Sequence, residues 1–152
     1  MEIPPSPQSS PAVRGWKLAV ALLSLIGLAD SIYLTVQHIT GETVRCTIVS
    51  GCSEVLSSPY ATVGGVPLAL LGAVAYFTVF SLATLAAFEY QFVTRLLAIV
   101  VGLMFLTTLW LLYLQAFVIG QFCQYCLLSA AITIIITLIT LLILRKSVVS
   151  SS

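Results

Sequence analysis

Four long runs of apolar residues dominate this sequence of 152 residues. Each has roughly the 17–25 residues that a helix needs to cross the hydrocarbon core of a bilayer. The runs cover residues 18–36, 66–88, 96–117 and 127–144. A segment in lipid must satisfy its own backbone hydrogen bonds, so unbroken runs of this length favour helices. The sequence therefore predicts an all-α membrane protein, a bundle of four transmembrane helices with a long extracytoplasmic loop after the first.

The composition agrees with a protein that lies in a lipid bilayer. Hydrophobic residues make up 60% of the chain and charged residues only 7%, against about 25% charged in an average soluble domain. The formal net charge is +1, which predicts no attraction to nucleic acid. Lipid, and not a nucleic acid, is therefore the expected surrounding partner.

The ends of the chain differ in composition from its middle. Residues 1–13 are rich in proline and serine and show no apolar period, so they are expected to form a disordered tail. Residues 147–152 are expected to be a second, short tail, which leaves 14–146 as one membrane domain. The first apolar run could instead be a signal peptide. However, the run resumes after Asp30, and this makes it long enough to span.

Basic residues predict how the four helices are oriented. An even number of spans puts both termini on one side, and five of the six basic residues share that side: Arg14, Lys17, Arg95, Arg145 and Lys146. The positive-inside rule then places both termini in the cytoplasm of a cell (inner) membrane. The loop 37–65 and the junction 120–123 are expected to face outward.

All four cysteines are expected to gather at this outward membrane face, in two close pairs. Cys123 and Cys126 form a C-x-x-C at the start of the fourth predicted helix, where the helix dipole favours a thiolate. A thiolate is the species that attacks a disulfide or a quinone. Cys46 and Cys52 lie in the long loop, beside the flexible Gly51. The outward side of the membrane is expected to be oxidising, and disulfides persist there. We therefore expect the two pairs to alternate between disulfide and thiol forms and so to transfer electrons.

Other uses of four cysteines remain open from spacing alone. They could form structural disulfides in a non-enzymatic membrane scaffold, or together hold one zinc ion. An oxidising compartment disfavours zinc, so no metal is expected. A c-type haem would need histidine directly after Cys126, where the sequence has Leu127.

Several motifs carry a resemblance to a known family. They are Cys46, Gly51-Cys52-Ser53-Glu54-Val55-Leu56-Ser57-Ser58-Pro59-Tyr60, Gly65-Val66-Pro67 with Gly72, Tyr113-Leu114, and Phe122-Cys123-Gln124-Tyr125-Cys126. The chain resembles the vitamin K epoxide reductase family, and its bacterial branch most. The spaced pair comes before the C-x-x-C, whereas DsbB, another quinone-linked protein, has the reverse order.

The resemblance implies a four-helix bundle around a quinone of the ubiquinone or menaquinone class. It implies that Cys46 exchanges disulfides with a separate thioredoxin-fold (DsbA-like) protein, that Cys52 passes electrons to Cys123, and that Cys126 reduces the quinone. Ser58 matches a family serine near the quinone ring. Residues 53–58 resemble the family's short surface helix.

Further residues bear on the substrate. Asp30, inside the first run, is a candidate proton donor to the quinone, because intramembrane acids are costly; it could equally be an acid paired with a polar side chain. Phe122 and Tyr113 are candidate walls of the quinone site. The animal enzymes carry a tyrosine where this chain has Ala130, which favours an ordinary membrane quinone. Reduction of a quinone epoxide remains the alternative reaction.

Overall fold

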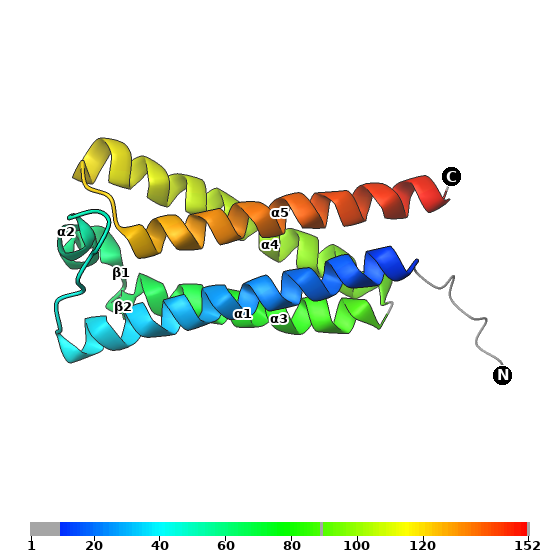
Figure 1. The fold of residues 1–152 in the computed structure, drawn as a ribbon, viewed down its shortest axis with the longest axis horizontal. Helices are drawn as coiled ribbons and strands as arrows, with labels where there is room; N and C mark the ends of the chain where they lie inside the picture. Colours follow the sequence, from blue (N-terminus) through cyan, green and yellow to red (C-terminus); the bar gives the residue numbers. More distant parts are fainter. Residues whose placement is uncertain (1–9, 89, 152) are drawn as a thin grey trace.

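The computed structural model describes residues 10–88 and 90–151, and four long helices dominate it (Figure 1). Within this part of the chain, four helices are long and apolar enough to cross a membrane. They are α1 Pro11–Thr40, α3 Leu68–Ala87, α4 Gln91–Tyr113 with its π-helical continuation η2 Leu114–Ile119, and α5 Gln124–Ser151. The expected all-α bundle of four membrane-spanning helices is confirmed.

Two of the helices extend into the predicted tails. α1 begins at Pro11, because proline is well suited to the first turn of a helix, where its missing N–H costs nothing. α5 continues to Ser151. Residues 11–13 and 147–151 are therefore helical, and Ser10 precedes α1 without helical structure. Residues 1–9 and 152 of the two predicted tails lie outside the described residues.

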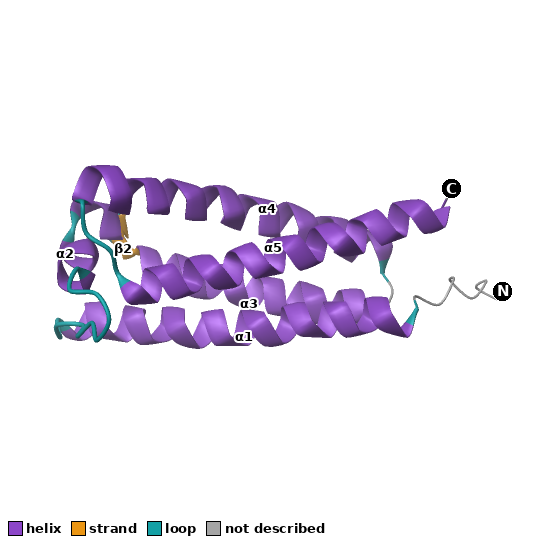
Figure 2. Ribbon diagram, turned by 45° about the horizontal axis from the view of Figure 1, so that its top comes forward, coloured by secondary structure: helices purple, strands orange, loops and turns teal. Residues whose placement is uncertain are grey.

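The long loop after α1 holds several short elements. α1 ends at Thr40 and is followed by Gly41, whose φ of 68° is left-handed. The elements that follow are α2 Cys52–Ser57, the 3₁₀ turn η1 Pro59–Ala61, and the antiparallel strands β1 Thr62–Val63 and β2 Val66–Pro67. α2 confirms the short surface helix. These elements lie at the end of the bundle opposite the two termini (Figures 1 and 2).

The core of the bundle lies between α1 and α3, which make the most extensive contact, and is completed by α4 and α5. A cluster of buried residues runs through it: Val20, Ala21, Tyr76, Val79, Leu82, Ala83, Leu97, Val101, Ile132 and Ile136. Tyr76 is 1% exposed, and its hydroxyl bonds to α5 through the carbonyl of Ser129 (2.9 Å) and the hydroxyl of Thr133 (3.0 Å). This polar contact ties α3 to α5.

A buried lysine holds the opposite end of the bundle together. The Lys17 ammonium donates a 2.8 Å hydrogen bond to the carbonyl oxygen of Ala86 in the last turn of α3. Lys146 lies over the ring of Trp16, with its ammonium 5.7 Å from the ring centroid. These contacts connect α1 to α3 and to α5.

Candidate redox site

The fold brings all four cysteines to one end of the bundle. Cys46 and Cys52 form a disulfide with their Cα atoms 5.8 Å apart, whereas Cys123 and Cys126 are free thiols. Cys52 and Cys123 belong to one buried apolar cluster, and Cys46 and Cys126 pack against that cluster. The two pairs, far apart in sequence, therefore form a single site.

The four cysteines differ in how far solvent reaches them. Cys52 and Cys123 are both 0% exposed. Cys46, in the loop, and Cys126, in the first turn of α5, are only partly buried. Solvent therefore reaches Cys46 and Cys126, whereas Cys52 and Cys123 are shielded from it.

Gly51 allows the loop pair to approach the C-x-x-C segment. Gly51 is buried at the N-cap of α2, where its carbonyl accepts from the amide of Val55 at 3.1 Å. A Cβ placed on Gly51 would meet the carbonyl oxygen of Phe122 at 2.7 Å and the Cβ of Gln121 at 2.8 Å. Only glycine fits this gap, so its place before Cys52 has a packing reason.

The backbone amide of Cys123 is held by a buried glutamine. Gln115 is 3% exposed, and its Oε1 accepts from the Cys123 N–H at 3.1 Å. Gln115 belongs to the π-helical turn η2, a rare geometry that often occurs at functional sites. The Cys123 carbonyl in turn accepts from the amide of Leu127 at 2.9 Å, in the first turn of α5. The cysteine therefore sits at the helix N-terminus, as predicted.

This position favours the thiolate form of Cys123. A hydrogen bond from the Cys126 thiol, helped by the backbone amides of Cys126 and Tyr125, lowers the pKa of Cys123 from 9.0 to about 7, although burial opposes the shift. The effect agrees with the general behaviour of C-x-x-C pairs at helix starts. Cys123 is therefore substantially ionised near neutral pH.

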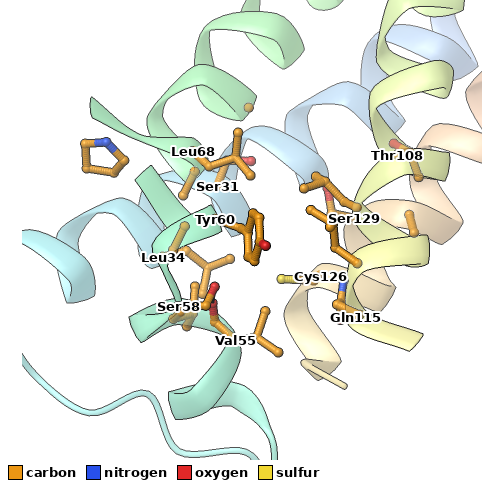
Figure 3. Close-up of a pocket in the computed structure, with 18 of the residues that line it drawn as sticks. Ser31, Leu34, Val55, Ser58, Tyr60, Leu68, Thr108, Gln115, Cys126 and Ser129 are labelled. Carbon is orange, nitrogen blue, oxygen red and sulfur yellow. Dashed lines mark hydrogen bonds between the residues drawn. The ribbon is translucent and has the colours of Figure 1, made fainter. Parts of the chain in front are cut away.

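A cavity of about 140 Å³ adjoins Cys126 (Figure 3). Its walls are mostly apolar and come from α1, the α2–η1 segment, α3, η2 with the end of α4, and α5. The polar residues that line it include Asp30, His38, Ser58, Tyr60 and Gln115. Oδ2 of Asp30 is buried and has no hydrogen-bond partner among the described residues.

The structure separates the residues that the sequence singled out. Asp30 and Ser58 line the cavity beside Cys126, and Ala130 contributes to its wall. Tyr113 and Phe122 do not line it. They are 50% and 43% exposed.

Tyr113 lies among aromatic side chains away from the cavity. Its ring is 5.9 Å from that of Trp110 and 5.2 Å from that of Phe117, between ring centroids. An apolar run does not reveal which face of its helix points inward, because lipid and protein interior are both apolar. Tyr113 therefore lies outside the wall of this cavity, and its candidate role at a quinone site stays a prediction.

Two cavity residues escaped the sequence reasoning. Gln115 is a polar residue inside an apolar run, and the cost of placing polar groups in lipid could have drawn attention to it. Tyr60 belongs to the motif that carries the family resemblance, but it was not among the candidate quinone-site residues, although it lies only two residues after Ser58. In the structure both contribute to the cavity wall (Figure 3).

Comparison with known proteins adds a family to this geometry. The model of the vitamin K epoxide reductase family matches residues 18–141, which include all four cysteines. The chain is also 35% identical over 112 residues to the thiol-disulfide oxidoreductase LTO1 of Arabidopsis thaliana. That alignment covers 68% of this chain and 30% of the relative, so the chain spans less than a third of that protein. Because the family model covers most of the bundle and the whole redox site, this chain belongs to the vitamin K epoxide reductase family.

Proposed function

We propose that this protein is a membrane thiol–quinone oxidoreductase that reoxidises a thioredoxin-fold protein outside the cytoplasm. The observation that carries the proposal is the order of accessibility in the cysteine series. Cys46 is partly exposed in the loop, Cys52 and Cys123 are buried together, and Cys126 lines an apolar cavity. The relative's name, thiol-disulfide oxidoreductase, supports thiol chemistry.

Two electrons pass along this series by disulfide exchange. Two thiols of the partner attack and reduce the Cys46–Cys52 disulfide, and the partner leaves as a disulfide. Cys52 then attacks Cys123 of an oxidised C-x-x-C, so the Cys46–Cys52 bond re-forms and Cys123 and Cys126 become thiols. These two thiols finally give two electrons and two protons to a quinone as their own disulfide forms.

The proposed cycle includes a stage with the cysteine pairing described above. At that stage the loop pair is a disulfide and the C-x-x-C pair is two thiols, so the two electrons would lie beside the cavity. The Cys123 thiolate, with a pKa of about 7, is the species that would attack Cys52 in the reverse exchange. The forward reaction therefore depends on quinone removing the electrons.

The cavity's polar groups suit an oxidised quinone, whose two carbonyls only accept hydrogen bonds. Oε1 of Gln115 is occupied by the Cys123 amide, which leaves its Nε2 hydrogens for a ligand. Tyr60 lines the cavity with a hydroxyl that can also donate. Ser58, in contrast, donates its hydroxyl hydrogen to the Val55 carbonyl at 2.7 Å. Gln115 and Tyr60 would therefore bind the carbonyls, and the unpartnered Asp30 carboxyl would supply a proton.

The distribution of charge supports the proposed orientation. Arg14 and Lys17 lie near the start of α1, Arg95 near the start of α4, and Arg145 and Lys146 near the end of α5. These helix ends lie at the end of the bundle opposite α2 (Figure 1). The positive-inside rule would place that end in the cytoplasm and the disulfide chemistry outside it. A DsbA-like protein would then be the electron donor, and a ubiquinone or menaquinone the acceptor.

The test is quinone reduction by the purified protein in detergent, with a reduced thioredoxin-fold donor. Wild type is compared with Cys46→Ala, Cys126→Ala and the exposed control Ser50→Ala. We expect turnover in wild type and the control, and none in the two cysteine variants. A small dithiol should restore quinone reduction in Cys46→Ala only.

Two further measurements complete the test. Asp30→Asn, which keeps the side chain's size but lacks its proton, should lower the rate of quinone reduction at saturating donor. Absence of turnover in wild type with ubiquinone, menaquinone and several donors would contradict the proposal and favour a scaffold with structural disulfides.

A further inference from the structure

One side chain connects the two redox segments directly. Gln124, the residue between Cys123 and Tyr125, accepts hydrogen bonds at its Oε1 from the backbone amides of Thr47 at 3.0 Å and Ile48 at 2.9 Å. The Thr47 hydroxyl is 3.3 Å from the same oxygen. Because backbone amides only donate, the acceptor must be the carboxamide oxygen.

The two amides lie inside the ring that the loop disulfide closes. Cys46 and Cys52 are six residues apart, and the disulfide holds their Cα atoms at 5.8 Å. Without the bond, a segment of this length can extend to roughly 20 Å. Successive amides that converge on one acceptor require a compact loop. The closed loop is therefore the form that Gln124 binds well.

We propose that Gln124 is a redox-linked latch, which holds the oxidised Cys46–Cys52 loop against α5 and so biases two electrons toward the Cys123/Cys126 pair. The reason is thermodynamic reciprocity. If closing the disulfide favours the latch, the latch favours the closed disulfide by the same factor. Gln124 is a positioning residue here, since it acts on the cysteines through the loop backbone.

The latch concerns an internal equilibrium that needs no quinone. Protein that carries one disulfide and two thiols can hold the disulfide at Cys46–Cys52 or at Cys123–Cys126. Exchange between these forms moves two electrons and two protons within the molecule and consumes nothing. Two hydrogen bonds of ordinary, partly exposed strength should shift this ratio by about tenfold. The inference rests on the proposed function only for the role that the latch would have in the catalytic cycle.

The experiment measures that ratio directly. Fully oxidised protein receives one equivalent of dithiothreitol without oxygen or quinone, equilibrates, and has its thiols alkylated and mapped by mass spectrometry. A pH of about 6, below the pKa of Cys123 near 7, keeps that thiol neutral. In wild type we expect alkylation mainly at Cys123 and Cys126. In Gln124→Leu the ratio should move about tenfold toward alkylation at Cys46 and Cys52.

Two variants separate the latch from a general effect on folding. Gln124→Glu keeps an acceptor oxygen at the same place, so its ratio should stay within about twofold of wild type. Gln91→Leu removes a side-chain carboxamide in the same way at the far end of the bundle, and it should leave the ratio of the two disulfide forms unchanged. If Gln124→Leu does not fold, judged by circular dichroism, Gln124→Met replaces it.

The outcomes are distinct. An unchanged ratio in Gln124→Leu would overturn the latch, as would an equal shift in Gln124→Glu. Failure of wild type to reduce quinone in the separate turnover assay would remove the proposed function but leave this measurement intact.

Discussion

Gly51 lies directly against the backbone of Phe122, so that the loop pair and the C-x-x-C segment touch without an intervening side chain. A Cβ on Gly51 would stand 2.7 Å from the Phe122 carbonyl oxygen and 2.9 Å from its nitrogen. Both neighbours are backbone atoms and cannot rotate away. The contact therefore determines how closely Cys52 can approach Cys123.

The first prediction concerns this contact. Gly51→Ala should force the two segments apart and slow disulfide exchange between Cys52 and Cys123, by about tenfold or more if the sulfurs separate by an ångström. Stopped-flow mixing with a reduced donor, followed by thiol trapping, measures the step. Ser50→Ala, at the exposed neighbouring position, is the control. Equal rates in Gly51→Ala and wild type would show that the close approach is not needed.

A second glycine should be needed for stability. A Cβ on Gly27 would overlap the ring of Tyr76, which is 1% exposed. Gly27→Ala should therefore lower the free energy of unfolding by about 1–3 kcal/mol, the usual cost of overpacking. Gly102, also within a helix, has nothing within 4 Å of its added Cβ. Gly102→Ala should be neutral or slightly stabilising. Thermal unfolding in detergent compares them, and equal destabilisation of both would contradict this packing argument.

The third prediction concerns the buried ammonium of Lys17. Lys17→Met keeps the length of the side chain but leaves the Ala86 carbonyl without its 2.8 Å donor. It also removes a positive charge from the C-terminal end of α3, where charge of that sign is favourable. The free energy of unfolding should fall by about 1–3 kcal/mol. The exposed Arg14→Met is the control. A loss no larger than that of the control would refute this role for Lys17.

The fourth prediction is a titration of the C-x-x-C pair. In protein with Cys46 and Cys52 both replaced by alanine, thiolate absorbance should rise with pH around a midpoint of about 7, from Cys123. The charged form is the stabilised one, so the thiolate is lost as pH falls through 7. Cys126→Ala removes the hydrogen bond that is the main cause, and the midpoint should rise toward 9.0. An unchanged midpoint would assign the shift to the helix N-terminus alone.

The main features of the fold follow from the sequence because they depend on length and composition. Four runs of about 20 apolar residues specify four spanning helices. Counting spans predicted that the C-x-x-C and the spaced pair lie on the same side, and the structure brings both to one end of the bundle. A short surface helix at residues 53–58 was expected from family resemblance, and the structure has α2 at Cys52–Ser57.

The details of the site depend on contacts that no local pattern encodes. The π-helical turn that presents Gln115 to Cys123 arises where α4 meets the loop before α5. The hydrogen bonds between Gln124 and Thr47 join residues 77 positions apart. Helix rotation, which separates Asp30 in the cavity from Tyr113 outside it, is set by packing between helices rather than by hydrophobicity.

The burial of Cys52 and Cys123 has a consequence for the unwanted loss of electrons from the proposed relay to molecules in solution. In the proposed relay, the two middle cysteines are 0% exposed, so exchange with outside molecules would occur only at Cys46 and Cys126. Glutathione or hydrogen peroxide in the surrounding water would meet Cys46 but not the two middle cysteines. Electrons that had entered the proposed relay would leave only by returning to the loop or through Cys126 into the cavity. The relay would therefore be protected from side reactions along its centre.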